Sequence, residues 1–164
     1  EVLDEYFSVR GDSNLALGPS DPEGDYELAL LSDDGSTLDL DPNGTGTFER
    51  WVDADGTHAN GLLCSAKTLH LSAGQQVPMK VNYYQGPRVR IALMLLWREK
   101  SGTPEPECGI IRGDTYYFTP VGSDPSVPTA KYDALVSRGW KPLSPENFVL
   151  PGQKTNPCAG KPSS

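Results

Sequence analysis

Two adjacent carboxylates, Asp33 and Asp34, follow an apolar segment that ends in Leu30-Leu31, with Ser32 between the segment and the pair. Gly35 and Ser36 follow, so the acidic pair stands where a strand would turn. Neighbouring carboxylates repel one another, and calcium relieves that repulsion because it takes carboxylate and loop carbonyl oxygens together. The same residues fit a plain hairpin turn, in which an Asp side chain caps backbone donors and Gly35 supplies a positive φ. The spacing alone leaves both interpretations open.

A second acidic loop runs from Asp53 to His58 and places two carboxylates ahead of Gly56. Aligned on that glycine, the loop is similar to the middle of an EF-hand. Trp51 stands where the first ligand of an EF-hand belongs, and Leu62 stands where its closing Glu belongs. The loop is therefore not an EF-hand, and an ordinary turn or a weak cation contact describes it.

The tripeptide Arg-Gly-Asp occurs twice, at 10–12 and at 112–114. The first copy continues into Ser13 as an integrin-binding tetrapeptide, but such short motifs recur by chance, and after a strand Gly and Asp form a natural turn. The second copy lies in a loop after the predicted central strand. Arg112 and Asp114 are therefore candidates for ligand contact, with a salt bridge inside the loop as the alternative.

Motifs of known catalytic centres are missing from the sequence. It has no Gly-x-Ser-x-Gly elbow, no glycine-rich phosphate loop and no His-Glu-x-x-His helix. His58 and His70 flank Cys64 without a second cysteine nearby, which argues against zinc. A glycosidase dyad depends on the separation of two carboxylates in space, which a sequence does not test. We therefore expect a protein that is not an enzyme.

The charge and the apolar runs exclude two kinds of partner. The 164 residues include 14 Lys and Arg against 22 Asp and Glu, a net charge of −8 that disfavours nucleic acid and anionic membranes. The longest apolar run, 91–97, is far shorter than the roughly 20 residues that span a bilayer. We expect no nucleic-acid partner and no membrane insertion. The start at Glu1, without a leader, suggests a mature secreted protein or an excised domain.

Strands are the elements that must position these loops. The 17 glycines and 15 prolines are too many for a helical bundle, and apolar and polar residues alternate in several windows. Residues 77–84 have one apolar face, whereas 91–97 is apolar on both faces and is expected to be a central strand covered from both sides. Strands are predicted at 5–9, 26–31, 37–40, 47–52, 67–71, 77–84, 89–97 and 115–118.

The C-terminal third differs from the rest of the chain. Residues 129–138 have helical spacing, with Thr129 as a candidate cap and Gly139 after the end. The proline-rich stretch that follows cannot form central strands and is expected to wrap the body in extended conformation. We predict a single domain over 1–151, including an extension from about 120, and a flexible tail over 152–164.

Three cysteines, Cys64, Cys108 and Cys158, allow three single pairings. Cys108 with Cys158 is the favoured pair, because it would tie the proline-rich extension and its tail to the body. Three reduced, buried thiols are the alternative.

From Tyr26 to Trp97 the residues resemble a known family. The segments 26–41, 71–74, 77–86 and 91–97 follow one another in a pattern that resembles the domain first defined in anthrax protective antigen, the protective-antigen-fourteen domain. That resemblance implies an antiparallel β-sandwich or barrel. The predicted fold class is therefore all-β, with one short C-terminal helix and a wrapping proline-rich tail.

The resemblance also implies a function. In adhesins of this family the adjacent aspartates of the corresponding turn, joined by a cis peptide bond, coordinate calcium that holds sugar hydroxyls; carried over, they are Asp33 and Asp34. The chain is then expected to be a secreted or cell-surface lectin or adhesin domain that binds calcium and glycans. Arg112 and Asp114 are the candidates in the second ligand loop, which lacks a matching acidic cluster. Trp51 is a candidate for stacking on a sugar or for packing in the core.

A second interpretation gives the domain no sugar ligand. It would be a structural or protein-interaction head or spacer of a larger fibre or surface protein, with homo-oligomer formation and an acidic turn ordered by backbone hydrogen bonds alone.

Overall fold

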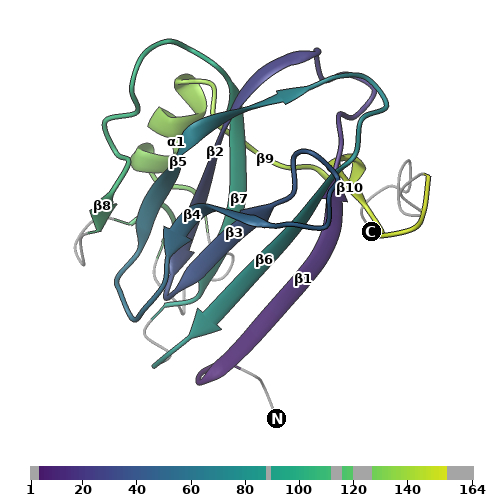
Figure 1. Cartoon of the computed structure of the whole chain (residues 1–164). Coiled ribbons are helices and arrows are strands. Elements are labelled where there is room, and N and C mark those ends of the chain that lie inside the picture. Colours follow the sequence, from purple (N-terminus) through teal and green to yellow (C-terminus); the bar gives the residue numbers. More distant parts are fainter. Residues whose placement is uncertain (1–3, 88–89, 112–115, 120–126, 155–164) are drawn as a thin grey trace.

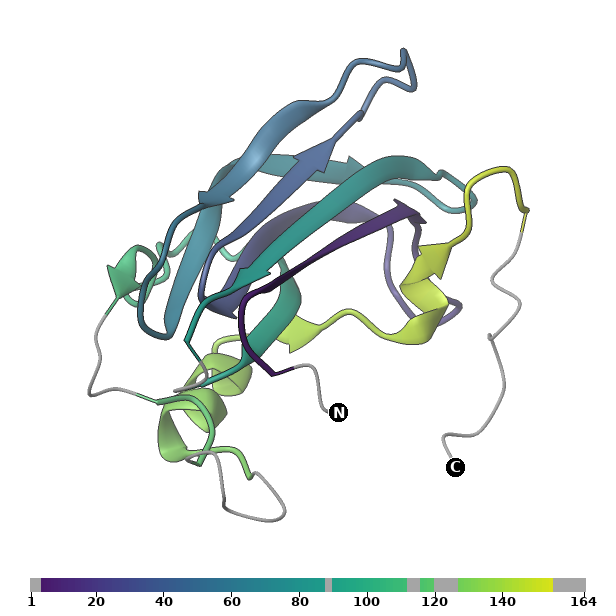
Figure 2. The same cartoon turned by 90° about the horizontal axis from the view of Figure 1, so that it is seen from below.

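Two five-stranded antiparallel sheets form a sandwich in the computed structural model, which describes residues 4–87, 90–111, 116–119 and 127–154 (Figure 1). The first sheet has the strand order β10-β1-β6-β3-β4, and the second has the order β8-β5-β2-β7-β9. Figure 2 shows the sheets as stacked layers, with the one described helix, α1, outside the second. The predicted all-β sandwich is confirmed. The elements are β1 (Phe7–Leu15), β2 (Gly24–Asp33), β3 (Ser36–Leu40), β4 (Glu49–Ala54), β5 (Gly61–Leu71), β6 (Val77–Gln85), β7 (Ala92–Glu99), β8 (Ile110–Ile111), α1 (Ala130–Ser137), a 3-10 turn (Pro145–Asn147), β9 (Lys141–Pro142) and β10 (Phe148–Val149).

The central strand of the second sheet, β2, is buried on both faces. Alternate residues of a strand point to opposite sides, so Leu28 and Leu30 of β2 enter the core between the sheets, whereas Leu31 faces a second apolar cluster. That second cluster includes Leu135 of α1. The end of the segment 91–97 behaves in the same way, since β7 sends Trp97 into the first cluster and Leu96 into the second. The expectation of a strand covered from both sides is confirmed for 94–97. It is wrong for the start of the segment, where Ile91 and Leu93 are 46 % and 41 % exposed, and the centre of the sheet is β2 rather than β7.

The first Arg-Gly-Asp copy lies within β1 rather than in a turn. Strand β1 extends to Leu15 and pairs with β6 along its whole length, in the register Arg10 with Asn82. Arg10 and Asp12 point to the same side of the strand, and the guanidinium donates two hydrogen bonds of 2.9 Å to the carboxylate. The expected turn is wrong, and the two charged groups of this tripeptide satisfy each other.

The C-terminal segment joins the two sheets at their edges. The predicted helix is confirmed over Ala130–Ser137, but Thr129 donates from its hydroxyl to the Tyr116 carbonyl instead of capping the helix. Strand β9 then pairs with β7, and β10 pairs with β1. Both two-residue strands lie at sheet edges, and at such an edge Pro142 of β9 costs no ladder hydrogen bond. Of the predicted strand 115–118, the described residues form only an isolated bridge between Phe118 and Pro128.

The disulfide joins Cys64 to Cys108, so the favoured pairing with Cys158 is wrong. The chain after β7 returns beside β5, where Cys108 bridges to Leu62. This brings the Cα atoms of the two cysteines to 5.4 Å, within the range that a disulfide requires. Cys158 and most of the predicted tail 152–164 lie outside the described residues.

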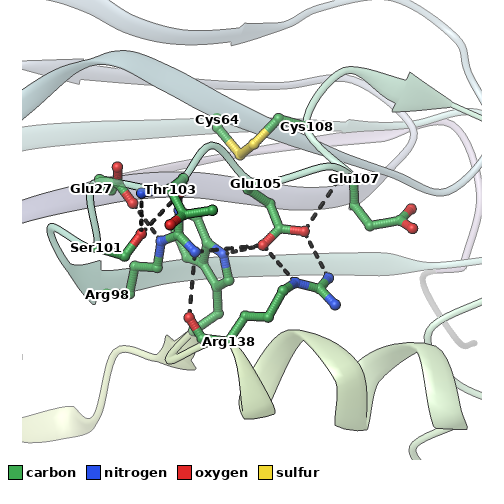
Figure 3. The surroundings of a disulfide bond; sticks show 10 residues. Glu27, Cys64, Arg98, Ser101, Thr103, Glu105, Glu107, Cys108 and Arg138 are labelled. Atoms are coloured by element: carbon green, nitrogen blue, oxygen red, sulfur yellow. Dashed lines mark hydrogen bonds and ion pairs between the residues drawn. A yellow bond between two sulfur atoms is a disulfide. The ribbon is translucent and has the colours of Figure 1, made fainter.

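A buried charge network lies beside the disulfide (Figure 3). Glu105, whose side chain is 1 % exposed, accepts hydrogen bonds of 2.9 and 2.7 Å from Arg138 and one of 2.9 Å from the Trp140 indole. Arg98 is also buried and pairs with Glu27. Burial would raise the pKa of Glu105, but the hydrogen bonds from Arg138, the Glu107 backbone and Trp140 outweigh it and hold that pKa below its ordinary value.

Glu105→Gln is expected to lower the free energy of unfolding at pH 7 by about 2 kcal/mol, because charge-assisted hydrogen bonds are lost. Since the folded-state pKa is lowered, the ionised group stabilises the fold above its ordinary pKa of 4.5, and this contribution disappears as the pH falls through the lowered value. Urea unfolding at pH 7 and pH 3 should therefore show a difference between variant and wild type that shrinks in acid. Glu99→Gln, at an exposed position on β7, is the control. An equal difference at both pH values would contradict this role.

Candidate functional site

Three turns meet at one end of the sandwich because of the strand register. Strand β2 pairs Ser32 with Gly61 at the start of β5 and Asp33 with Ala92 at the start of β7. Ser36, at the start of β3, pairs with Ala54 at the end of β4. The β2–β3, β4–β5 and β6–β7 connections therefore lie together, and the acidic pair stands in the first of them.

The Asp33–Asp34 peptide bond is cis, as the family resemblance implies. Both side chains are buried, at 7 % and 4 % exposure. Gly35 does not adopt the positive φ expected of a hairpin glycine. It is needed for a close approach instead, because a Cβ at this position would lie 2.8 Å from the carbonyl oxygen of Gly56.

Asp34 connects the other two loops. Its Oδ1 accepts a hydrogen bond of 3.0 Å from the backbone N–H of His58, and its Oδ2 accepts one of 2.7 Å from the backbone N–H of Gly86. A Cβ at Gly86 would come within 2.9 Å of that Oδ2, so a side chain at this position would disturb the contact. The carboxylate of Asp34 thus fixes the β4–β5 loop relative to the β6–β7 loop.

The ionised form of the Asp33 carboxyl group is disfavoured by its surroundings. Burial and the neighbouring charge of Asp34 raise the pKa of Asp33, against the opposing effects of His58 and of hydrogen bonds from Asn60. Its backbone carbonyl accepts a hydrogen bond of 2.6 Å from the Tyr83 hydroxyl. Two carboxylates held side by side, one of them resisting ionisation, favour a bound cation.

A pocket of about 420 Å³ opens over the acidic pair. Besides Asp33 and Asp34, it is lined by residues of the two neighbouring loops and of the segment before α1. Both ring nitrogens of His58 lie 2.8 Å from backbone carbonyl oxygens, those of Ala54 and Ala59, so the ring is held by the loop and is not free to ligate a metal. The other lining residues are Thr57, Ala59, Pro87, Arg90 and Tyr116.

The donor set fits a hard cation that takes oxygen ligands. Within the described ranges no three His, Cys, Asp or Glu side chains converge, so a metal would need amide or carbonyl oxygens beside the Asp pair. Asn60, which is 6 % exposed and acts to lower the pKa of Asp33, has a buried Oδ1 without a partner among the described residues. Each Asp34 oxygen uses one lone pair for a backbone N–H and keeps another. These oxygens are of the type that calcium prefers.

The other predicted site residues are not brought to this pocket. Trp51 is 9 % exposed and packs in the core between the sheets, with Lys67 Nζ 5.4 Å from its ring centroid, so the packing interpretation describes it. Arg112 and Asp114 lie outside the described residues. The second acidic loop is an ordinary turn, in which Asp55 accepts from the Gly56 N–H. Its role is to present His58 to Asp34.

Comparison with known proteins identifies the class. The family model described as the PA14 domain matches residues 19–108, more than half of the chain, and the chain belongs to this family. The match includes the acidic pair, all three loops of the pocket and both bonded cysteines. Tyr116, the remaining part of the pocket lining, lies beyond it.

One solved structure is also similar, the PA14 domain of the antifreeze protein MpAFP. Its sequence is 14 % identical, and the alignment covers 59 % of this chain and 45 % of that one, with a TM-score of 0.43. The present chain thus spans less than half the length of that protein chain. No curated protein matches.

Proposed function

We propose that this chain is a calcium-dependent carbohydrate-binding domain, and that Asp33, Asp34 and Asn60 hold the ion. The observation that carries the proposal is the buried pair of carboxylates at the base of an open pocket, with the unpartnered Asn60 oxygen beside it. Membership of the PA14 family supports the proposal, because the family is often carbohydrate-binding in adhesins.

The residues supply only part of a calcium coordination shell. Calcium takes six to eight oxygen ligands, and a bound ion would offer its remaining positions to neighbouring sugar hydroxyls. Asp34 holds the two loops that wall the pocket, while Pro87 provides apolar surface for a sugar ring. The arrangement suits binding without turnover.

The proposed setting is outside the cell, with glycans on a cell or polymer surface as partners. PA14 domains occur in secreted and surface proteins, and a disulfide such as Cys64–Cys108 is stable in oxidising compartments. No helix among the described residues is long and apolar enough to cross a membrane.

One observation favours a structural or protein-interaction head instead. Both oxygens of Asp34 already accept backbone N–H groups, so the turn is ordered without an ion. In that case the domain would form a defined oligomer on size exclusion and would bind neither calcium nor sugars.

A glycan array probed in millimolar calcium and again in excess chelator separates the two functions. The lectin proposal predicts binding in calcium that disappears with chelator. Binding that ignores the chelator would overturn the role of calcium, and absence of binding in both conditions would favour the structural head.

Calcium should also stabilise the fold. At a free concentration of about 100 times its Kd a ligand adds about 2.7 kcal/mol, which for a domain of this size raises Tm by about 5–10 °C. Magnesium should give little shift, because it keeps its waters and demands a tighter octahedral shell. Thermal unfolding followed by circular dichroism in calcium, magnesium and chelator measures this. Equal Tm values in calcium and chelator would speak against the site.

A further inference from the structure

Arg90 and Tyr116 form a wall of the same pocket, opposite in chemistry to the acidic pair. The guanidinium carbon of Arg90 lies 3.3 Å from the centroid of the Tyr116 ring. A guanidinium carbon this close to a ring centroid contacts the face of the ring. The N–H groups of a guanidinium point outward in its plane, so this contact does not use them.

Arg90 differs from the other described arginines in its partners. Within the described part of the chain, it alone makes no ion pair with a carboxylate. The others pair in turn with Asp12, Asp39, Glu27 and Glu105; they are Arg10, Arg50, Arg98 and Arg138.

A chain of hydrogen bonds fixes Arg90 relative to the acidic pair. The fully buried side chain of Gln85 donates from Nε2 to the backbone carbonyls of Arg90, at 2.8 Å, and of Pro87, at 3.2 Å. The Tyr83 hydroxyl shares its one proton between the Oε1 of the same amide and the Asp33 backbone carbonyl oxygen. The backbone of Arg90 and the backbone of Asp33 are therefore held by one buried network, so the segments that carry the guanidinium and the carboxylates are fixed relative to one another.

The charge of the pocket depends on the ion. Two carboxylates and one guanidinium line it, and together these three groups carry a formal charge of −1. One bound calcium ion would change that to +1. A pocket with calcium bound then attracts an anionic ligand. The N–H donors of the Arg90 guanidinium match the planar, bidentate geometry of a carboxylate.

We propose that the pocket selects glycans that carry a carboxylate, with Arg90 as the residue that recognises it. This inference rests on the proposed function: sugar hydroxyls bind on the side of Asp33 and Asp34, and the sugar carboxylate pairs with the Arg90 N–H groups. Tyr116 holds the guanidinium in place through its ring.

The test compares oligosaccharides that differ only in their terminal residue, glucuronic acid, glucose or 6-sulfated glucose, by titration calorimetry in millimolar calcium. Wild-type protein should bind the glucuronic acid form about tenfold or more tightly than the glucose form. Arg90→Gln should lose that preference and keep its affinity for glucose. Arg90→Lys, which keeps charge without the planar fork, should retain only part of it. Arg10→Gln, which removes the same charge from β1, is the control and should bind like wild type.

The results of this titration test the role of Arg90 and the proposed ligand class. Calcium-dependent binding of glucose and glucuronic acid with equal affinity, or a preference that survives Arg90→Gln, would overturn the role of Arg90 while leaving the lectin proposal standing. A stronger preference for the sulfated form would replace the carboxylate by sulfate and overturn the proposed ligand class. Failure of the wild type to bind any of the three sugars, together with an absence of calcium binding, would overturn both proposals.

Discussion

Asp34→Asn is expected to abolish calcium binding and, with it, glycan binding. The variant removes the negative charge and one of the two carboxylate oxygens that the ion would need beside Asp33. It keeps an Oδ1 that accepts from the His58 N–H, so the β4–β5 loop retains its contact. The Gly86 N–H loses its acceptor, at a cost of about 1–3 kcal/mol. Calcium titration and the glycan array measure the loss of binding.

A matched control separates this effect from a loss of negative charge in general. Asp55→Asn removes a carboxylate from the neighbouring loop, where Asp55 accepts from the Gly56 backbone N–H and lies outside the pocket lining. It should bind calcium and glycans like the wild type. Circular dichroism confirms that both variants fold. Retention of calcium-dependent glycan binding by folded Asp34→Asn would contradict the assignment of the site.

Loss of the disulfide is expected to be the largest change in stability. Cys64 and Cys108 close a loop across 44 residues, and constraining a loop of that length in the unfolded chain is worth about 4 kcal/mol. For a domain of this size that corresponds to a fall in Tm of about 8–16 °C. The bond also holds the segment that carries Glu105, so its loss exposes the buried charge network (Figure 3).

Urea unfolding of the Cys64→Ala, Cys108→Ala double variant against wild type measures this stabilisation. Cys158→Ala is the control, because it leaves the Cys64–Cys108 pair intact, and it should unfold like the wild type. A double variant as stable as the wild type would show that the bond does not stabilise the fold.

Strand alternation predicted the sandwich because most strands bury one face. The alternation in 77–84 and the apolar run 91–97 both indicate which faces of a strand are buried, because hydropathy follows burial. The pattern failed in β1, which extends six residues beyond the predicted end at Val9. Residues 10–13 have no apolar side chain, so hydropathy gives no sign of a strand there. Backbone pairing with β6 is what extends the strand through them.

The candidate site was only partly visible in the sequence. The acidic pair stood out because two carboxylates followed an apolar strand, and the family pattern added their role. Asn60, Arg90 and Tyr116 carried no local signal, since they come from segments that only the strand register and the segment before α1 bring together. The predicted cysteine pairing was wrong for the same reason, because the return of the chain beside β5 is a feature of the tertiary structure that has no local sequence signal.

Isothermal titration of calcium into the chelator-treated domain measures whether Asp33 and Asp34 hold an ion. We expect one calcium ion bound per chain, and no binding by a folded variant that carries both Asp33→Asn and Asp34→Asn. Absence of binding to the wild-type protein at millimolar calcium, or unchanged binding in the double variant, would contradict this expectation.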